Sequence, residues 1–286
     1  MQIADASQFQ PRMTFAYPSH QKGPRMEEYA FLWMSNHTDL LSDDYVYVPV
    51  FWDNYHVTHN FGRQGIAELQ EYCDKLSITY RGKKIFTVVE YADGTLINSN
   101  IVSFACGGKG DIPIPLLCDA HPFNHQDNTQ FYATFTGNLS THIVRQKLID
   151  IYGAKPGWHI GPSEGISRFR FLMDNSKYAL CPRGYGPTSY RLFEAIQMGC
   201  IPVYIGDDFW LPYKDISEFD WNSFSVLVNI KNIQSLGDIL AEEDLIYRKK
   251  MEVLHEIQYK FTHEQVMFYI IKKIGVYENI LHYTSF

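Results

Sequence analysis

The stretch NSKYALCPRGYGPTSYRLFEAIQMGCIPVYIGDD, residues 175–208, predicts a strand, a glycine-rich loop, a helix and a second strand in direct succession. Residues 177–182 form a short apolar run typical of a buried parallel strand, and the loop RGYGP that follows cannot continue it. Thr188 or Ser189 can cap a helix that ends at Gly199, and residues 200–205 return as a strand. Because backbone N–H groups at a helix N-terminus attract anions and glycines let a phosphate approach, the stretch predicts a diphosphate site.

The same region resembles a known family. Residues 181–213, CPRGYGPTSYRLFEAIQMGCIPVYIGDDFWLPY, are similar to the signature of exostosin-like glycosyltransferases, the family 47 inverting enzymes. The resemblance is strongest over residues 177–224 and fair over residues 131–148. It implies the GT-B architecture, an α/β fold with two Rossmann-like lobes facing a cleft. It also implies transfer of a sugar from a nucleotide-sugar with inversion at the anomeric carbon.

Two segments supply the predicted donor site. The first is the loop and helix of the opening stretch, where Arg191 and Glu194 lie three residues apart, off the apolar stripe of the helix, and can face one ligand. The second, TFTGNLSTHIVR at residues 134–145, resembles the family's glycine-asparagine turn followed by a helix with an arginine. We expect arginines to bind the diphosphate and Glu194 to bind the ribose hydroxyls. The predicted donor-binding residues are Gly137, Asn138, Arg145, Arg183, Tyr185, Gly186, Thr188, Ser189, Tyr190, Arg191 and Glu194.

Inverting transfer needs a base that removes the proton of the acceptor hydroxyl. In a two-lobed enzyme this base is expected from the N-terminal lobe, at the carboxyl end of a strand that faces the cleft. Asp93, in an Asp-Gly turn after the apolar run at residues 85–89, is the first choice, and Asp53 and His56 after residues 45–52 are placed equally well. Asp119 and His121 are further alternatives. Asp93-Gly94 is also a common plain turn.

A metal site is not expected. Cys118, His121 and His125 have a spacing seen in zinc sites, and His56 with His59 adds a second pair. The polar, proline-containing run at residues 119–128 suits a hinge, however, and a second cysteine pair is absent. The chain also lacks the Asp-x-Asp pair through which many glycosyltransferases bind Mn²⁺ or Mg²⁺. We therefore expect no cofactor besides the UDP-sugar co-substrate.

The alternation of strand and helix patterns predicts two successive α/β units. The hinge at residues 119–128 separates an acceptor-side lobe, residues 1–126, from a donor-binding lobe, residues 127–286. Predicted strands outside the opening stretch are residues 13–17, 45–52, 84–91, 101–105, 131–135 and 224–230. Predicted helices are residues 26–34, 64–76, 140–152, 165–174, 236–241, 245–259 and 263–274.

The composition of the chain excludes some classes of partner and predicts where the protein is found. With 286 residues, a net charge of −7 and no block of Lys and Arg, the chain is not expected to bind nucleic acid. The five scattered cysteines lie mostly in apolar runs and predict reduced core thiols. No apolar run of transmembrane length and no signal-peptide pattern occurs, so we expect a soluble, cytoplasmic protein, in contrast to the membrane-anchored Golgi enzymes of the family.

The resulting expectation is an inverting, metal-independent transferase that moves a sugar from a UDP-sugar to a saccharide hydroxyl and forms a β-linkage. The acceptor is an oligosaccharide or the glycan of a glycoprotein. UDP-xylose is the preferred donor, because the compact form without an anchor resembles exostosin-domain proteins of large DNA viruses of algae. The alternative is a non-catalytic protein of the same fold that binds UDP or carbohydrate. A Rossmann dehydrogenase is disfavoured, because residues 183–189 do not supply the G-x-G-x-x-G spacing.

Overall fold

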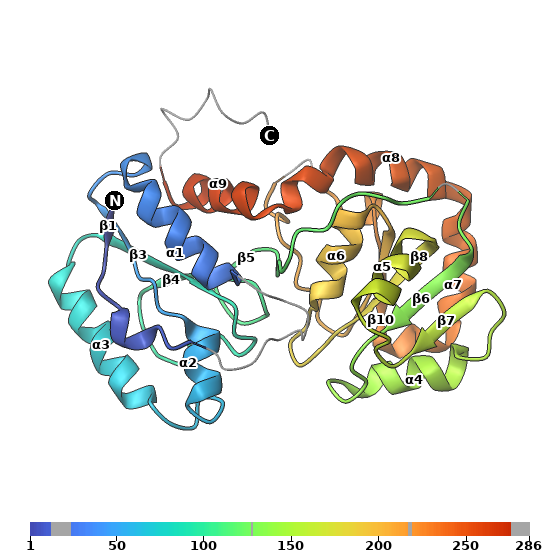
Figure 1. The fold of residues 1–286 in the computed structure, drawn as a ribbon. Coiled ribbons are helices and arrows are strands. Elements are labelled where there is room, and N and C mark those ends of the chain that lie inside the picture. Colours follow the sequence, from blue (N-terminus) through green and yellow to red (C-terminus); the bar gives the residue numbers. More distant parts are fainter. Residues whose placement is uncertain (13–23, 127, 217–218, 276–286) are drawn as a thin grey trace.

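The chain folds into two α/β lobes, as the computed structural model in Figure 1 shows. The structure describes residues 1–12, 24–126, 128–216 and 219–275. Within these residues each lobe contains one five-stranded, wholly parallel sheet. The two-lobed α/β fold expected from the resemblance is confirmed.

The N-terminal lobe has its described strands in chain order, β1-β2-β3-β4-β5. The strands are β1 (Gln2–Ile3), β2 (Tyr45–Tyr47), β3 (Lys84–Val89), β4 (Val102–Ala105) and β5 (Ile112–Pro113), and the helices are α1 (Met26–Asn36), α2 (Trp52–Thr58) and α3 (Ile66–Thr79). Side chains alternate between the two faces of β3. Phe86 and Val88 pack on the face that carries α1, and Ile85 and Val89 pack on the face that carries α3. Both faces are buried, which explains why the strand is apolar throughout rather than alternating with polar residues.

The C-terminal lobe has the order β7-β6-β8-β9-β10, so its strand order reverses beside the first strand. The strands are β6 (Phe131–Thr136), β7 (Trp158–Gly161), β8 (Ser176–Pro182), β9 (Ile201–Gly206) and β10 (Val226–Asn229). The chain leaves β6 for one side and returns to the other side at β8. In open parallel sheets such a switch point leaves a crevice beyond the carboxyl ends of the two strands, which is where ligands bind.

The helices of the second half are α4 (Ile143–Tyr152), α5 (Ile166–Asp174), α6 (Tyr190–Met198), α7 (Leu236–Glu243), α8 (Tyr247–Ile257) and α9 (His263–Ile274). Short 3-10 helices are Ser7–Phe9, Thr38–Leu40, Trp221–Ser223, Ile230–Ser235, Asp244–Ile246 and Gln258–Phe261. Figure 1 shows α9 crossing back to lie beside α1. The ring of Phe268 packs edge-on against Trp33 at 5.4 Å, so the end of the described chain is part of the first lobe's core. Every helix in the described ranges is too short or too polar to span a bilayer.

The sequence located most of these elements, and the exceptions have physical reasons. The predicted strand at residues 45–52 is wrong at its end, because β2 stops at Tyr47 and α2 begins at Trp52. Burial of Trp52 and Tyr55 against the sheet overrides the strand preference of these aromatic residues. The short strands β1 and β7 were not predicted, since two to four residues give too little periodicity. The predicted strand at residues 13–17 lies outside the described residues. All five cysteines are free and buried, as predicted.

Candidate functional site

The crevice at the switch point lies beyond the ends of β6 and β8. The turn Gly137-Asn138 follows β6 directly, and Arg183 follows β8 directly. The sequence therefore placed both donor segments at the position that parallel-sheet topology reserves for a ligand. Asn138 shapes its turn by accepting hydrogen bonds from the N–H and the hydroxyl of Ser140, at 3.0 and 2.8 Å.

The N-terminus of α6 opens onto this crevice. Ser189 is the N-cap residue, with extended backbone dihedrals, but its side chain makes no capping hydrogen bond. Its hydroxyl oxygen is buried and has no hydrogen-bond partner within the described part of the chain, and the same holds for Nε of Arg183. Buried polar atoms are normally satisfied, so two such atoms beside a helix N-terminus point to a polar ligand there.

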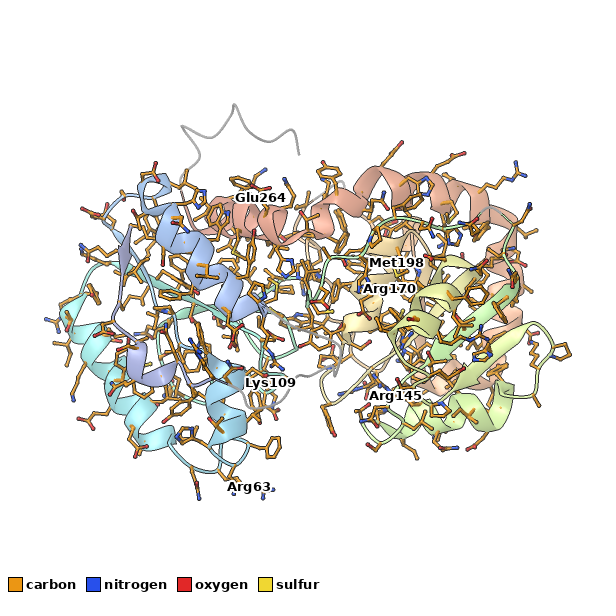
Figure 2. All side chains as sticks on the ribbon, in the orientation of Figure 1. Arg63, Lys109, Arg145, Arg170, Met198 and Glu264 are labelled. Carbon is orange, nitrogen blue, oxygen red and sulfur yellow. The ribbon has the colours of Figure 1, made fainter. Side chains whose placement is uncertain are left out.

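The three arginines of the predicted donor site have different partners. Arg183 forms an ion pair with Asp207 and donates from Nη2 to the carbonyl oxygen of Tyr185 at 3.2 Å. Arg145, labelled on the second lobe in Figure 2, is buried and donates to the carbonyl oxygens of Asn138, Pro182 and Arg183 at 2.8, 3.2 and 3.0 Å. Arg145 thus ties the turn after β6 to the end of β8. Its predicted contact with phosphate stays a prediction.

Arg191 and Glu194 lie deeper on α6. The Arg191 guanidinium donates to the carbonyl oxygen of Thr136 and lies over the rings of Phe135 and Phe169, at 5.0 and 4.8 Å. Burial lowers the pKa of Arg191, and the Glu194 carboxylate opposes that shift. Glu194 is only 5% exposed. The two residues therefore share a buried environment, which their positions off the apolar stripe of the helix did not predict. Their predicted ligand contacts stay predictions.

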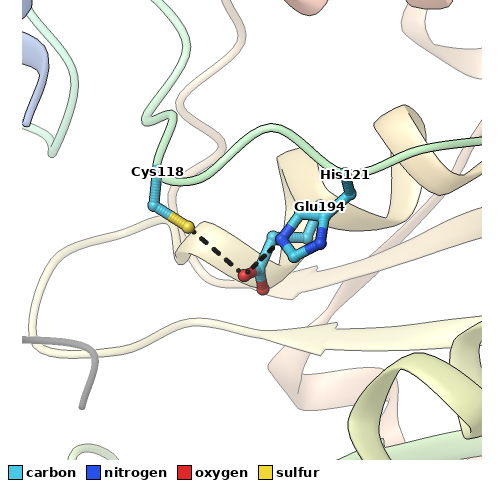
Figure 3. Close-up of side chains that lie close together, drawn as sticks. All are labelled: Cys118, His121 and Glu194. Atoms are coloured by element: carbon cyan, nitrogen blue, oxygen red, sulfur yellow. Dashed lines mark hydrogen bonds and ion pairs between the residues drawn. The ribbon is translucent and has the colours of Figure 1, made fainter. Parts of the chain in front are cut away.

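The linker between the lobes reaches Glu194. Figure 3 shows Cys118 and His121 converging on one carboxylate oxygen of Glu194, with Cys118 Sγ and His121 Nε2 each 3.3 Å from it. The three side chains are buried, and their ligand-type atoms lie within 4.8 Å of one another. Burial, and next the charge of Glu194, raise the pKa of the Cys118 thiol. His125, which completes the zinc-like spacing in the sequence, lies instead near the hydroxyl of Tyr247.

Sequence reasoning missed a buried ionic cluster at the carboxyl end of β3. Glu90, the residue after this strand, is 5% exposed, and Glu27 and Arg25 at the start of α1 are buried beside it. Glu27 accepts hydrogen bonds from the backbone N–H of Glu90 at 2.6 Å and from that of Asp53 at 3.1 Å. Arg25 forms an ion pair with Asp53. The signal in the sequence was a carboxylate at the end of an apolar strand, IFTVVE. Burying a charge there costs free energy unless the charge is paired and hydrogen-bonded.

Glu90 has an unusual proton affinity. Burial raises its pKa to about 7, and the nearby charge of Asp53 adds to the shift. The Arg25 charge and the hydrogen bonds from the Tyr190 hydroxyl and the Met26 N–H oppose it. A carboxyl group with a pKa near neutrality can both accept and release a proton under ordinary conditions.

Three contacts join the two lobes around Glu90. The hydroxyl of Tyr190, at the start of α6, donates to Glu90. Trp210 Nε1 donates to the carbonyl oxygen of Ala105 at 3.0 Å. The loop of the opening stretch packs on the first lobe so closely that a Cβ atom at Gly186 would lie 2.9 Å from Cβ of Ala92 and even nearer the carbonyl oxygen of Gly107. The absence of a side chain at Gly186 therefore lets the backbone of the first lobe approach the loop. The sequence alone did not reveal this steric requirement.

The predicted base residues lie in three different settings. Asp93 is exposed and forms an ion pair with Lys109 at 2.9 Å. Burial raises the pKa of Asp53, and its partner Arg25 opposes the shift. His56 is buried in α2 with Nε2 3.1 Å from the carbonyl oxygen of Thr95, and burial lowers its pKa to about 4. Asp53 thus belongs to the Glu90 cluster, whereas the catalytic roles of all three remain predictions.

The remaining predicted donor residues flank α6. Thr188 is buried just before the helix, and the hydroxyl of Tyr190 donates its hydrogen bond to Glu90. Tyr185, at 69% exposed, extends its ring from the loop into solvent. An exposed aromatic ring beside a polar crevice offers a face for stacking a base or a sugar.

Comparison with known proteins agrees with these features. Residues 81–242, more than half of the chain, match the family described as the Exostosin GT47 domain. A "Probable glycosyltransferase" of Arabidopsis thaliana is 32% identical over 116 residues, which cover 39% of this chain and 20% of that protein. A "Probable glucuronosyltransferase" of Oryza sativa subsp. japonica is 33% identical over 105 residues, 37% of this chain and 24% of that protein. The chain thus accounts for a quarter or less of the length of these relatives.

Solved structures give weaker likenesses. S. aureus TarM, in a complex with UDP, has a TM-score of 0.45 and 11% identity, with 88% of this chain and 59% of that chain covered. A glycosyltransferase from Rickettsia africae has a TM-score of 0.41 and 14% identity, with 90% and 83% covered. These values add nothing to the fold that the strand order establishes. On the match over residues 81–242, the chain belongs to the Exostosin GT47 domain family.

Proposed function

We propose that the chain is an inverting, metal-independent glycosyltransferase that moves a sugar from a UDP-sugar to a saccharide hydroxyl, forming a β-linkage. The C-terminal lobe holds the donor, and the N-terminal lobe holds an oligosaccharide or glycoprotein-glycan acceptor. The observation that carries the proposal is the switch point of the second sheet, where the Gly137-Asn138 turn and Arg183 follow neighbouring strands and Arg145 donates to both. The N-terminus of α6 follows the loop after Arg183. UDP-xylose is the first donor to test.

The diphosphate sits at the N-terminus of α6 in this proposal. The unpartnered Ser189 hydroxyl and the Arg183 side chain supply donors, and the helix dipole favours the negative charge. Transfer leaves a nucleoside diphosphate with growing negative charge, which these fixed donors stabilise without a metal ion. Arg145 acts by holding the two loops together, since its guanidinium is bonded to their carbonyl oxygens.

The ribose lies further along α6, where Glu194 can accept hydrogen bonds from two hydroxyl groups. Glu194 is about one helical turn from the first residue of α6, so a nucleoside attached to a diphosphate at the helix end can reach it. The charges of buried Arg191 and Glu194 attract each other, which holds the two side chains together on this face of α6. Nucleotide binding then displaces Cys118 and His121 from this oxygen.

Glu90 is the best-placed base for the acceptor hydroxyl. It lies at the carboxyl end of a parallel strand, it faces the start of α6 through Tyr190, and its pKa near 7 matches proton transfer at neutral pH. Asp93, the first choice from the sequence, lies three residues after Glu90, where its side chain is exposed and paired with Lys109. Glu90 is therefore proposed as base in preference to Asp93, Asp53 and His56.

The test is UDP release from a panel of UDP-sugars, with and without an acceptor and with and without EDTA. Acceptor-dependent release that survives EDTA supports the proposal. Strict dependence on added Mn²⁺ would rule out metal-independent transfer. UDP binding without release from any donor would favour the non-catalytic alternative.

A further inference from the structure

We propose that Cys118, His121 and Glu194 form a site for Zn²⁺ or a similar thiophilic divalent cation, which clamps the linker between the lobes onto α6. Cys118 and His121 lie on the linker between β5 and β6, and Glu194 lies on α6. The site is distinct from the diphosphate crevice, because its ligands come from the linker and from the interior of the helix. The binding of the cation itself does not depend on the proposed transfer reaction.

Two of the three separations between ligand atoms match those of a tetrahedral cation site. In a zinc site, metal–ligand distances of about 2.0 to 2.3 Å place neighbouring ligand atoms about 3.3 to 3.6 Å apart. Sγ of Cys118 and Nε2 of His121 are each 3.3 Å from the same carboxylate oxygen, and all three ligand atoms lie within 4.8 Å of one another. Three protein ligands leave a fourth position for water, a common arrangement for zinc.

The ligand chemistry selects the cation. A thiolate and an imidazole favour Zn²⁺, Co²⁺ or Cd²⁺ over Mg²⁺ and Mn²⁺, which prefer oxygen ligands. The C-x-x-H spacing brings the first two ligands together on one short segment, and all three side chains are buried. The second ring nitrogen of His121, Nδ1, has no hydrogen-bond partner in the described ranges, so Nε2 can coordinate without breaking a bond at Nδ1.

Binding is a proton-for-metal exchange. The Cys118 S–H bond breaks, its proton leaves to solvent, and the sulfur forms a bond to the cation, while Glu194 and neutral His121 donate existing lone pairs. The thiolate and the carboxylate together balance the two positive charges. Nearby Arg191 carries a further positive charge, which weakens the affinity without removing any ligand.

The consequence for function follows from the use of Glu194. A cation on this carboxylate occupies the group that the ribose needs, so the cation and the nucleotide compete. This competition rests on the proposed function. Zn²⁺ is then an inhibitor of the transferase rather than a participant in the reaction. EDTA treatment accordingly preserves or raises activity.

The test is a titration of the purified full chain with Co²⁺, followed by its thiolate-to-cobalt absorption, and then displacement by Zn²⁺. We expect one equivalent of Co²⁺ to give the absorption in wild type and in Cys73→Ser, a buried thiol of the other lobe. Cys118→Ser and His121→Asn lose the absorption, while circular dichroism shows them folded. No absorption in wild type, or full absorption in folded Cys118→Ser, overturns the site.

A second measurement separates this proposal from the proposed function. UDP binding is measured by calorimetry at increasing Zn²⁺, in wild type and in Cys118→Ser. Zn²⁺ weakens UDP binding in wild type and leaves it unchanged in Cys118→Ser if both proposals hold. Cobalt binding with no UDP binding at any Zn²⁺ level contradicts the nucleotide site alone, and UDP binding without cobalt absorption contradicts the metal site alone.

Discussion

The two lobes both contain a parallel sheet, but they differ in strand order and in the charges buried at the strand ends. The second lobe reverses its strand order between β6 and β8, and a glycine turn and a helix N-terminus follow the strands at this switch point, where parallel sheets bind ligands. The described strands of the first lobe follow one another in chain order, so that sheet has no such reversal. At the carboxyl end of its strand β3 it carries a buried ionic cluster instead. Topology thus marks the proposed donor site, whereas desolvated charges mark the proposed acceptor side.

The largest expected effect comes from Glu90→Gln, which tests whether the first lobe supplies the base. Loss of a general base lowers kcat by about 10² to 10⁴-fold, while the donor lobe keeps its affinity for UDP. A base must be deprotonated, so wild-type kcat/KM rises with pH through about 7, the pKa of Glu90, and this limb disappears in the variant. Steady-state kinetics across pH, with UDP binding by calorimetry, measures both.

Two companion variants sharpen the test of Glu90. Tyr190→Phe removes a hydrogen bond that favours the charged form of Glu90, so the pKa of Glu90 rises. The rise of kcat/KM with pH therefore moves to higher pH in this variant, with activity retained. Asp93→Asn keeps near-normal transfer. If Asp93→Asn loses activity and Glu90→Gln does not, the base is Asp93, as the sequence alone suggested.

Arg183→Ala has the next largest effect and tests the second lobe. Removing one donor to the leaving diphosphate lowers the rate by about 100-fold, and UDP binding weakens with it. Arg63→Ala is the matched control, since Arg63 is exposed on the first lobe, at its lower edge in Figure 2. Equal rates for the two variants would remove Arg183 from the diphosphate site.

The difference between the lobes also explains how far the sequence could be interpreted. Residues 177–205 encode β8, the loop, α6 and β9 as one local pattern, so these elements, and the position of Arg183 directly after β8, were predictable there. The Glu90 cluster unites the start of α1, the start of α2 and the end of β3. No local pattern in the sequence reports that Arg25, Glu27 and Asp53 meet Glu90, and the burial that chiefly raises the pKa of Glu90 arises only in the folded chain.

Gly186→Ala comes third and tests whether the lobes touch as closely as the structure places them. The added methyl group would clash with the Gly107 carbonyl oxygen and with Ala92, and such overpacking costs about 1 to 3 kcal/mol of unfolding free energy. Gly161→Ala in β7 is the control, because a Cβ atom there meets no atom within 4 Å. Urea unfolding of both variants gives the difference, and equal stability would mean that the loop does not pack on the first lobe in solution.

The smallest expected effect separates Asp93 from Glu90 by environment. Lys109 and Asp93 form an ion pair whose side chains are 73% and 58% exposed, and solvent-exposed pairs contribute about 0 to 1 kcal/mol. Lys109→Met should therefore change stability little, and a double-mutant cycle with Asp93→Asn should give a coupling energy below about 1 kcal/mol. Transfer rates should match wild type in both, because water solvates each charge that loses its partner. Buried Glu90 has no such compensation, so a rate loss in Lys109→Met as large as that of Glu90→Gln would mean that acceptor chemistry takes place at the exposed loop and not at the end of β3.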